Sequence, residues 1–520
     1  MNQLEGIVQL DEQQSQALLE RVRAQIDPED FKLIQGLLFT VSQLLDMISA
    51  SRMSISKLKR MIFGPKTEKF PKSDSQTKDK DKPRPKPKGH GRIAASQYTG
   101  AHKVSIPLEN LEAGQCCPDC KSAKLYPQKP GAVIFVQAQA PFDATLYEPE
   151  RLRCQGCGKT YTAPLPEETV HGKHHSSVPA MIAMLRYGMG LPHYRLAKIQ
   201  KTMGVPLPAA TQNELVNALA HSCQSVLNAL REEAAQSSLF FNDDTTIKIT
   251  RVDPPEEAEH KGTWTTGILS QSGQRTIGLF SSGRKHAGNN LDALLDKRDV
   301  TLKEPIQMCD GLSRNWPTGH KTERSQCVTH GRRNFVDIRE NFAELCDHFI
   351  ERLGTVYHID QLARDRKLDA QARLLLHQEN SAETMAELKT WLEEQKASPD
   401  NEPNSGFGRA CEYMLKRWDQ MTLFLKKPGA PMDNTPCERL LKTAILHRKN
   451  SLFYRTLNGA KTGDLYMSLI QTCALNQINP LDYLSALSAN VDKLANNPSA
   501  WLPWNYTDNL APPGTPSKPG

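Results

Sequence analysis

Near the start of the chain, hydrophobic residues recur with the spacing of a helix that pairs with another helix. From Ile34 to Ile62 they follow one another in steps of three and four residues over about four heptads, with Ser51 as an interruption. The pattern predicts a coiled coil through which the chain self-associates, or else an amphipathic helix packed on its own protein. Phe63-Gly64-Pro65 marks the end of this helix.

The next residues offer no hydrophobic set from which a core could form. Lys66 to Arg92 contains eight Lys and two Arg against four acidic residues, which is most of the chain's formal net charge of +7. We expect a disordered basic linker over 65–100, either simply solvated or in contact with the phosphates of a nucleic acid.

Two pairs of cysteines flank a stretch with the alternation of β-strands. Cys117 and Cys120 form one CxxC, Cys154 and Cys157 form another, and Cys116 could replace a member of the first. Four thiolates in two tight turns suit tetrahedral Zn²⁺. Residues 101–170 are therefore expected to be a zinc-ribbon DNA-binding domain that holds structural zinc.

Residues 180–235 have helical periodicity throughout. Within this segment, LPHYRLAKIQKTMGVPLPAAT indicates a helix, a turn with Gly, and a second helix that starts near Ala210. This resembles a helix-turn-helix, with Lys198 and Lys201 as candidate DNA contacts, although helix pairs of this kind also occur in ordinary helical domains.

Acidic residues stand where purely structural strands would not place them. Asp243 and Asp244 lie within the apolar run SSLFFNDDTTIKIT, and their side chains point to opposite faces of the expected strand. Strands TWTTGILSQ and TIGLFSS and a helix near Leu291–Leu295 follow. Asp310 ends a further short strand, where it could bind a ligand or cap the turn.

A third acid is expected on a helix. After the strand-to-helix junction at Ser325–His330 and a long helical stretch, Pro436 marks a helix start, so that Glu438 falls in its first turns. Three meander strands, a helix, a strand with an acid, another strand and a helix with Glu is the order of an RNase H-like fold. Carboxylates gathered in this way suit Mg²⁺ or Mn²⁺ in two-metal-ion phosphoryl transfer.

These motifs resemble the IS-sixty-six family of bacterial DDE transposases (TnpC-type) over nearly the whole chain. FGPKTEK, the CxxC pairs, NDDTT at 242–246, CDG at 309–311, CVTHGRRNF at 327–335 and DNTPCERLLKTAILHRKNSLF at 433–453 occur in the family's order, and SLIQTCALNQINPLDYL at 468–484 is similar to its C-terminal segment.

The resemblance implies a function and a set of residues. Asp243, Asp310 and Glu438 would be the catalytic, magnesium-binding triad of a transposase that cleaves DNA ends and transfers strands. Cys327 and His330 would form the family's CxxH, which either packs the core or positions DNA. The assignment of Glu438 depends most on the resemblance.

Several residues depart from the family's pattern. They are Asp244, Thr246, Leu312, Val328, Thr435 and Cys437. None of them belongs to the triad, so we expect metal binding to survive while substrate fit could differ.

Basic residues beside the motifs are expected to contact DNA phosphates, which position a duplex without reading its sequence. They are Arg332, Arg333, Arg439, Lys442, Arg448 and Lys449. The resemblance also implies double-stranded DNA partners, namely terminal repeats and target, a homo-oligomer, and small companion proteins of the same element.

Composition sets the remaining expectations. Charged residues make up 24% of the chain, and no apolar run of about 18 residues suggests a membrane span. The acidic start lacks the features of a secretory signal, so we expect a cytoplasmic protein with no membrane partner.

The expected protein is multidomain α+β. Its parts are a helical region at 1–64, the linker at 65–100, the zinc ribbon at 101–170, a helix-turn-helix-like region at 171–236, a catalytic domain at 237–470 with a helical insertion at about 340–430, and a C-terminal segment with a disordered tail at 471–520. Two alternatives stay open: an inactive zinc-ribbon regulator that binds DNA, and an RNase H-like nuclease without strand transfer.

Overall fold

The computed structural model divides the chain into two compact units, Met1–Phe135 and Val136–Gly520. It describes Asp27, Phe31 and residues 113–116, 118, 121, 124–125, 141–153, 160–166, 173–252 and 262–510. The predicted coiled coil, the basic linker, the C-terminal tail from residue 511 and the four zinc cysteines Cys117, Cys120, Cys154 and Cys157 lie outside these residues. Of the first unit, the description is limited to short pieces such as the β-bridge between Cys116 and Lys124.

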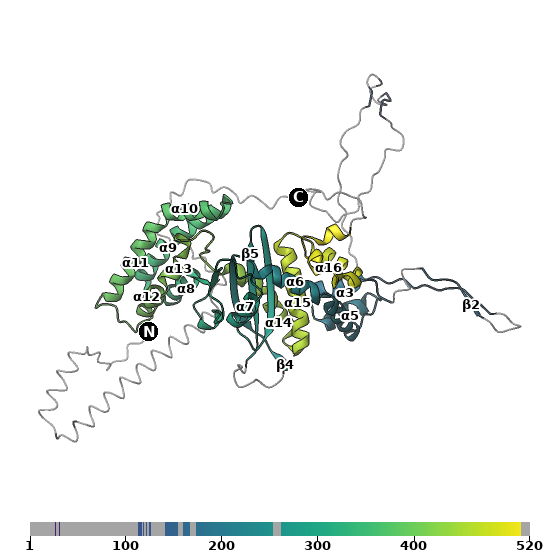
Figure 1. The fold of residues 1–520 in the computed structure, drawn as a ribbon, viewed down its shortest axis with the longest axis horizontal. Helices are drawn as coiled ribbons and strands as arrows, with labels where there is room; N and C mark the ends of the chain where they lie inside the picture. The colour runs from purple at the N-terminus through teal and green to yellow at the C-terminus, as the bar shows by residue number, and fades with distance from the viewer. Residues whose placement is uncertain are drawn as a thin grey trace, which may run out of the picture. The chain divides into compact units, whose positions relative to one another are not determined.

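A mixed five-stranded sheet forms the centre of the second unit (Figure 1). The strand order is β6-β5-β3-β7-β8, with β5 antiparallel to β3 and β6, and with β7 parallel to β3 and β8. The strands are β3 (Leu239–Thr246), β5 (Trp264–Ser272), β6 (Arg275–Gly283), β7 (Ile306–Cys309) and β8 (Glu323–Gln326). The predicted meander is present, and this α+β arrangement is consistent with an RNase H-like domain.

Helices cover both faces of the sheet. Helices α14 (Thr435–Ser451) and α15 (Leu457–Leu475) pack on one face, and α6 (Gln224–Ala235) and α7 (Ala287–Leu295) pack on the other. Two glycines allow the close approach of α14: a Cβ on Gly267 would lie 3.0 Å from Leu441, and one on Gly278 would lie 2.7 Å from Leu440. The α14 face of the sheet is therefore shaped for the helix that carries Glu438.

Helices precede the sheet in sequence, as predicted. They are α3 (Ser177–Ala183), the π-helical turn η3 (Met184–Gly188), α4 (His193–Thr202) and α5 (Ala209–Ser222). Gly204, with φ +79°, supplies the turn between α4 and α5. The buried side chain of Gln212 donates to the carbonyl oxygens of Leu207 and His193 and fixes this turn against both helices.

A two-stranded hairpin flanks the second CxxC in sequence. Strands β1 (Arg151–Arg153) and β2 (Thr160–Thr162) pair antiparallel. The zinc ribbon itself stays a prediction.

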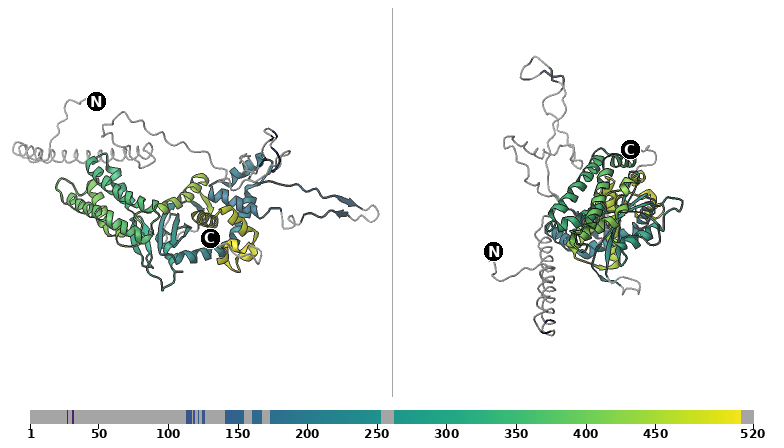
Figure 2. Two further views of the ribbon diagram at one scale, coloured as in Figure 1. Left: turned by 90° about the horizontal axis from the view of Figure 1, so that it is seen from above. Right: turned by 90° about the vertical axis from the view of Figure 1, so that its left-hand side faces the viewer.

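The segment between β8 and α14 forms a helical lobe with its own hydrophobic core. It contains α8 (Val328–Ile338), α9 (Ala343–Asp365), α10 (Ala370–Asn380), α11 (Ala382–Ala397), α12 (Gly406–Lys416), α13 (Trp418–Met421) and η5 (Leu423–Leu425). The left-hand view of Figure 2 shows this lobe to one side of the sheet. Helix α8 begins at Val328, within the predicted strand-to-helix junction Ser325–His330, so His330 belongs to its first turn.

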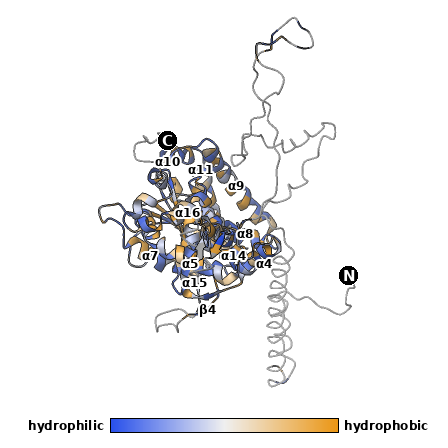
Figure 3. Cartoon of the chain, turned by 90° about the vertical axis from the view of Figure 1, so that its right-hand side faces the viewer, coloured by the Kyte–Doolittle hydropathy of each residue, from blue (hydrophilic) through white to orange (hydrophobic). Residues whose placement is uncertain are grey.

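The remaining elements complete the second unit. They are β4 (Ile249–Arg251), η4 (Ser313–Asn315), β9 (Tyr454–Thr456), α16 (Pro480–Ala489), α17 (Val491–Leu494), η6 (Pro498–Trp501) and η7 (Tyr506–Asn509). Strands β4 and β9 form a separate parallel pair. The helices carry both hydrophobic and hydrophilic residues (Figure 3), and no helix among the described residues is long and apolar enough to cross a membrane. The predicted domain boundaries stay predictions, and α15 runs through the one at residue 470.

Candidate active site

The two adjacent acids of β3 point to opposite faces of the sheet. Asp243 pairs with Gly267, whose position lies against α14, whereas Asp244 pairs with Thr266. The hydroxyl of Thr266 accepts a hydrogen bond from Asn290 of α7, 2.7 Å away. Asp243 therefore shares a face with the helix that bears Glu438, and Asp244 faces α7.

Asp244 is committed to partners within the fold. Its side chain is 1% exposed, and its two carboxylate oxygens lie 2.8 Å from Nδ1 of His286 and 3.3 Å from Nη2 of Arg314. Each of the two carboxylate oxygens therefore has a cationic or hydrogen-bonding neighbour. The structure gives Asp244 a packing and charge-pairing role beneath the sheet.

Asp310 follows β7 directly, which ends one residue earlier than predicted. One carboxylate oxygen accepts from the N–H of Leu312 at 3.1 Å and from the side-chain amide of Asn315 at 2.5 Å. Asp310 therefore caps the turn that follows β7, as one of the two interpretations of the sequence predicted. It coexists with proximity to Asp243, since the Asp310 charge is among the groups that perturb the Asp243 carboxyl.

The start of α14 is anchored to β3 and to β5. The side-chain amide of Asn434, which is fully buried, donates to the carbonyl oxygen of Asn242 at 3.2 Å. The thiol of Cys437 contacts the carbonyl oxygen of Gly267 at 3.3 Å. Glu438 lies in the first turn of this helix, as predicted, and so stands next to the β3 face that carries Asp243.

Electrostatics links the three candidate acids. Burial, followed by the negative charge of Asp310, raises the pKa of Asp243 to about 7, and the charges of Asp244 and Glu438 add to the rise. A hydrogen bond from the Asp244 N–H, 2.8 Å long, opposes it. Burial is therefore the main reason that ionisation of Asp243 is unfavourable, and the charges of the other acids add to it.

The donor chemistry around Asp243 fits a hard divalent cation. The candidate ligands are carboxylate oxygens, and the nearby thiols of Cys309, Cys327 and Cys437 are held as neutral groups because burial raises their pKa values. As the side chains stand, the described residues contain no group of three His, Cys, Asp or Glu side chains arranged as a metal site. Asp243 and Glu438 lie on the α14 side of the sheet, and Asp310 follows the neighbouring strand β7.

The two CxxH residues lie in different surroundings: Cys327 is buried, and His330 lies near Glu438. Cys327 is 1% exposed, and its sulfur accepts a hydrogen bond from the N–H of Asn434 at 3.3 Å. It thereby holds the loop that leads into α14. His330, one turn into α8, places Nε2 4.0 Å from Oε1 of Glu438, so this member of the motif faces the candidate site.

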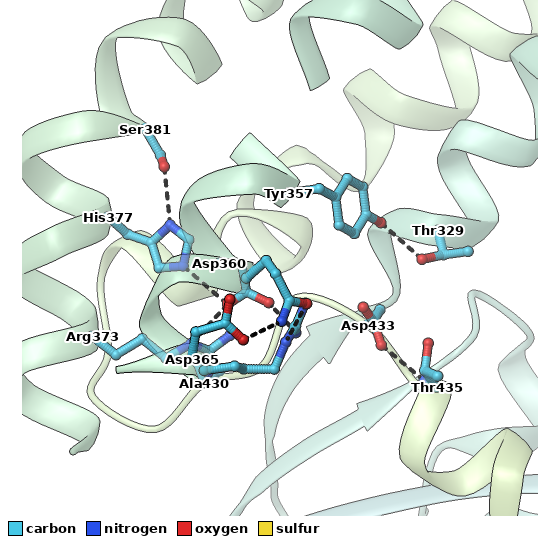
Figure 4. Close-up of polar contacts among 12 residues, drawn as sticks. Thr329, Tyr357, Asp360, Asp365, Arg373, His377, Ser381, Ala430, Asp433 and Thr435 are labelled. Atoms are coloured by element: carbon cyan, nitrogen blue, oxygen red, sulfur yellow. Dashed lines mark hydrogen bonds and ion pairs between the residues drawn. The ribbon is translucent and has the colours of Figure 1, made fainter. Parts of the chain in front are cut away.

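Two groups of polar contacts in the helical lobe reach α8 and the loop before α14 (Figure 4). Tyr357 of α9 hydrogen bonds to Thr329 of α8 at 2.8 Å. One turn further along α9, Asp360 is 1% exposed and lies 2.7 Å from Arg373 and 3.2 Å from His377. Arg373 also donates to the carbonyl oxygen of Ala430, in the loop before α14, at 3.3 Å.

The cluster around Asp360 is charged although Asp360 is buried. Burial alone would raise the pKa of Asp360, but the hydrogen bond from His377 and the charges of Arg373 and Arg364 lower it to about 2. The ionised form is therefore stabilised within the lobe. Sequence reasoning missed this group, because one acid among many on a long helix gives no signal of its partners.

The candidate DNA-contacting residues occupy two helices. Arg332 and Arg333 lie on α8, and Arg439, Lys442 and Lys449 are exposed on α14. Arg448 differs, because its guanidinium donates to the hydroxyl oxygens of Thr245 and Thr246 at 3.0 Å. It braces α14 against the end of β3.

Comparison with known proteins assigns the chain to a family. The model of the Transposase IS66 family matches residues 171–462, which is more than half of the chain and includes all three candidate acids. Relatives in Sinorhizobium fredii are uncharacterized proteins: y4jD is 24% identical over 90% of this chain and 96% of its own length, and y4hP is 25% identical over 69% and 67%. The chain belongs to the Transposase IS66 family.

Proposed function

We propose that the protein is a DNA transposase in which Asp243, Asp310 and Glu438 form a DDE triad. The proposal rests on the placement of Asp243 and Glu438 on the α14 face of the sheet, with Asp310 at the end of the neighbouring strand β7. The raised pKa of Asp243, caused by burial and by the charges of the other acids, supports it. Repulsion among carboxylates costs stability in the folded protein, and a bound divalent cation would remove that cost.

The three acids would hold Mg²⁺ or Mn²⁺, which when bound activates the attacking hydroxyl and stabilises the leaving oxygen at a DNA phosphate. The chain's own residues prepare this site. Asn434 and Cys437 fix the start of α14 on the sheet, and His330 stands beside Glu438. Asp244 stays with His286 and Arg314 and takes no part in holding the metal.

The decisive experiment measures cleavage and joining of DNA that carries the terminal repeats of the element, in the presence of Mg²⁺. We expect Asp243→Asn, Asp310→Asn and Glu438→Gln to reduce both steps to background while DNA binding persists. Asp296→Asn, a carboxylate with a side chain 71% exposed on the far end of α7, is the matched control and should remain active.

Three outcomes would redirect the proposal. Equal joining by the three variants and by the wild type would refute the triad. Cleavage by the wild type without any joining would favour an RNase H-like nuclease. A wild type that binds DNA but performs neither step would favour the regulator.

We further propose that Cys117, Cys120, Cys154 and Cys157 bind structural Zn²⁺, with their spacing as the support. The zinc content of purified protein tests this independently of activity. About one Zn²⁺ per chain is expected for the wild type, and much less for Cys117→Ser combined with Cys154→Ser. Unchanged zinc in that variant would remove the assignment.

A further inference from the structure

Two exposed hydrophobic side chains stand at the C-terminal end of α14, which we call the apolar tip (Leu452 and Phe453). Leu452 is 68% exposed and Phe453 is 44% exposed. Leu452 has φ +66° and ψ −44°, and the N–H of Phe453 donates to the carbonyl oxygen of Ser451 at 2.8 Å. This is a γ-turn with positive φ, a rare and strained conformation for a branched residue.

The residues on either side of the apolar tip are firmly held. The N–H of Leu452 donates to the carbonyl oxygen of Arg448 at 2.8 Å, and the N–H of Tyr454 donates to that of Lys248 at 2.9 Å. Tyr454 is buried, and its ring stacks on His447 with centroids 4.8 Å apart. Strain that the surroundings impose in this way tends to occur at functional sites. The fold therefore presents the apolar tip to solvent on a rigid base.

Positive charge surrounds the apolar tip and leads to it from the candidate active site. Along the exposed face of α14, Arg439, Lys442 and Lys449 follow Glu438 at helical spacing. Exposed cations also stand on or beside the β4–β9 pair next to the tip; they are Lys248, Arg251 and Arg455. Such a surface complements the phosphate backbone of a nucleic acid better than an apolar protein partner.

The length of the helix sets the separation between the apolar tip and the candidate active site. Glu438 and Leu452 lie on one continuous helix and its cap, which at about 1.5 Å per residue separates them by about 21 Å. At about 3.4 Å per base pair, this corresponds to about six base pairs of duplex.

We infer that the apolar tip inserts between base pairs of duplex DNA about six base pairs from the phosphate that meets the triad, while the basic residues grip the backbone. Leu and Phe are typical wedges of this kind, which unstack a base step and bend the duplex. The inference rests on the proposed function, because the position of the insertion is measured from the phosphate that meets the triad.

The test uses duplexes of the terminal repeat in which 2-aminopurine replaces one base at successive positions. Without added Mg²⁺, binding by the wild type should raise 2-aminopurine fluorescence at one or two adjacent positions. Leu452→Gly with Phe453→Ala removes both side chains, and Gly accepts the positive φ, so the turn and the fold are kept. This variant should lose the rise, and its affinity should fall about 5- to 100-fold with unchanged salt dependence.

Two matched variants separate the wedge from other effects. Val300→Ala with Leu302→Ala truncates hydrophobic side chains that are 98% and 43% exposed elsewhere, and it should behave as the wild type. Lys442→Gln with Lys449→Gln should reduce the salt dependence and keep the fluorescence rise.

Fluorescence that stays flat at every position while the wild type binds the duplex, and cleaves it once Mg²⁺ is added, overturns the wedge and leaves the transposase proposal standing. A rise that persists in Leu452→Gly with Phe453→Ala also overturns it. Failure of the wild type to bind DNA would overturn both proposals together.

Discussion

Neutralising Asp243 should stabilise the metal-free protein even as it abolishes activity. The pKa of Asp243 is raised to about 7 in the folded chain, compared with about 3.9 for an unfolded Asp. The full difference of about three units corresponds to about 4 kcal/mol. Because the carboxyl is coupled to other acids and not fully buried, we expect Asp243→Asn to raise the free energy of unfolding by about 1–3 kcal/mol at pH 8.

The pH dependence has a definite sign. The pKa of Asp243 is higher in the folded state than in the unfolded state, so protonation of Asp243 favours the folded state. The wild type therefore loses stability as the pH rises from about 4 to about 7. The advantage of Asp243→Asn should therefore be smallest near pH 4, grow through this window and stay constant above it. Thermal denaturation of both proteins without Mg²⁺, at pH 4.5 and at pH 8, measures the effect.

The neighbouring residue supplies a control with the opposite sign. Asp244→Asn weakens the contacts with His286 and Arg314, so it should lower the free energy of unfolding at pH 8 by about 1–3 kcal/mol. Added Mg²⁺ should raise the melting temperature of the wild type and leave that of Asp243→Asn unchanged. If both substitutions destabilise the protein equally at pH 8, the electrostatic account of Asp243 is wrong.

Further predictions concern the lobe and the packing around the sheet. Asp360→Asn should lower the free energy of unfolding by about 3–5 kcal/mol, since it breaks a buried charge network, whereas the exposed Asp365→Asn should change it by less than about 0.5 kcal/mol in the same denaturation assay. Gly288→Ala should lower the yield of folded protein and its melting temperature, because the new Cβ would lie 2.2 Å from the carbonyl oxygen of Trp316. Gly354→Ala, on α9 with open space around it, should instead stabilise by about 0.5–1 kcal/mol; destabilisation there would contradict the helix assignment.

Local patterns predicted the elements of the candidate site well. The apolar run around Asp243, the strand segments TWTTGILSQ and TIGLFSS, and Pro436 before Glu438 each reflect the conformational preference of a few neighbouring residues. The strands and the helix appear where they were expected. Such features depend on a few adjacent residues, which a single sequence contains in full.

What the sequence could not supply depends on distant residues. Alternation shows that Asp243 and Asp244 point apart, but the choice between the two faces follows from α14 covering one and Arg314 reaching the other. The positive φ of Leu452 had no local signal, because Leu is not a residue expected there. Asn434 was likewise missed, since its importance comes from contacts with Cys327 and Asn242.

The position of the helical lobe between Asp310 and Glu438 has a consequence during translation. Roughly 130 residues separate these two acids, so at about 5–20 residues per second the ribosome needs about 6–26 s to proceed from one to the other. Throughout that interval the nascent chain holds both aspartates without the glutamate. Under the proposed function, a product that stops within the lobe contains all five strands of the central sheet and both aspartates but lacks α14 and Glu438, so premature termination yields no complete triad.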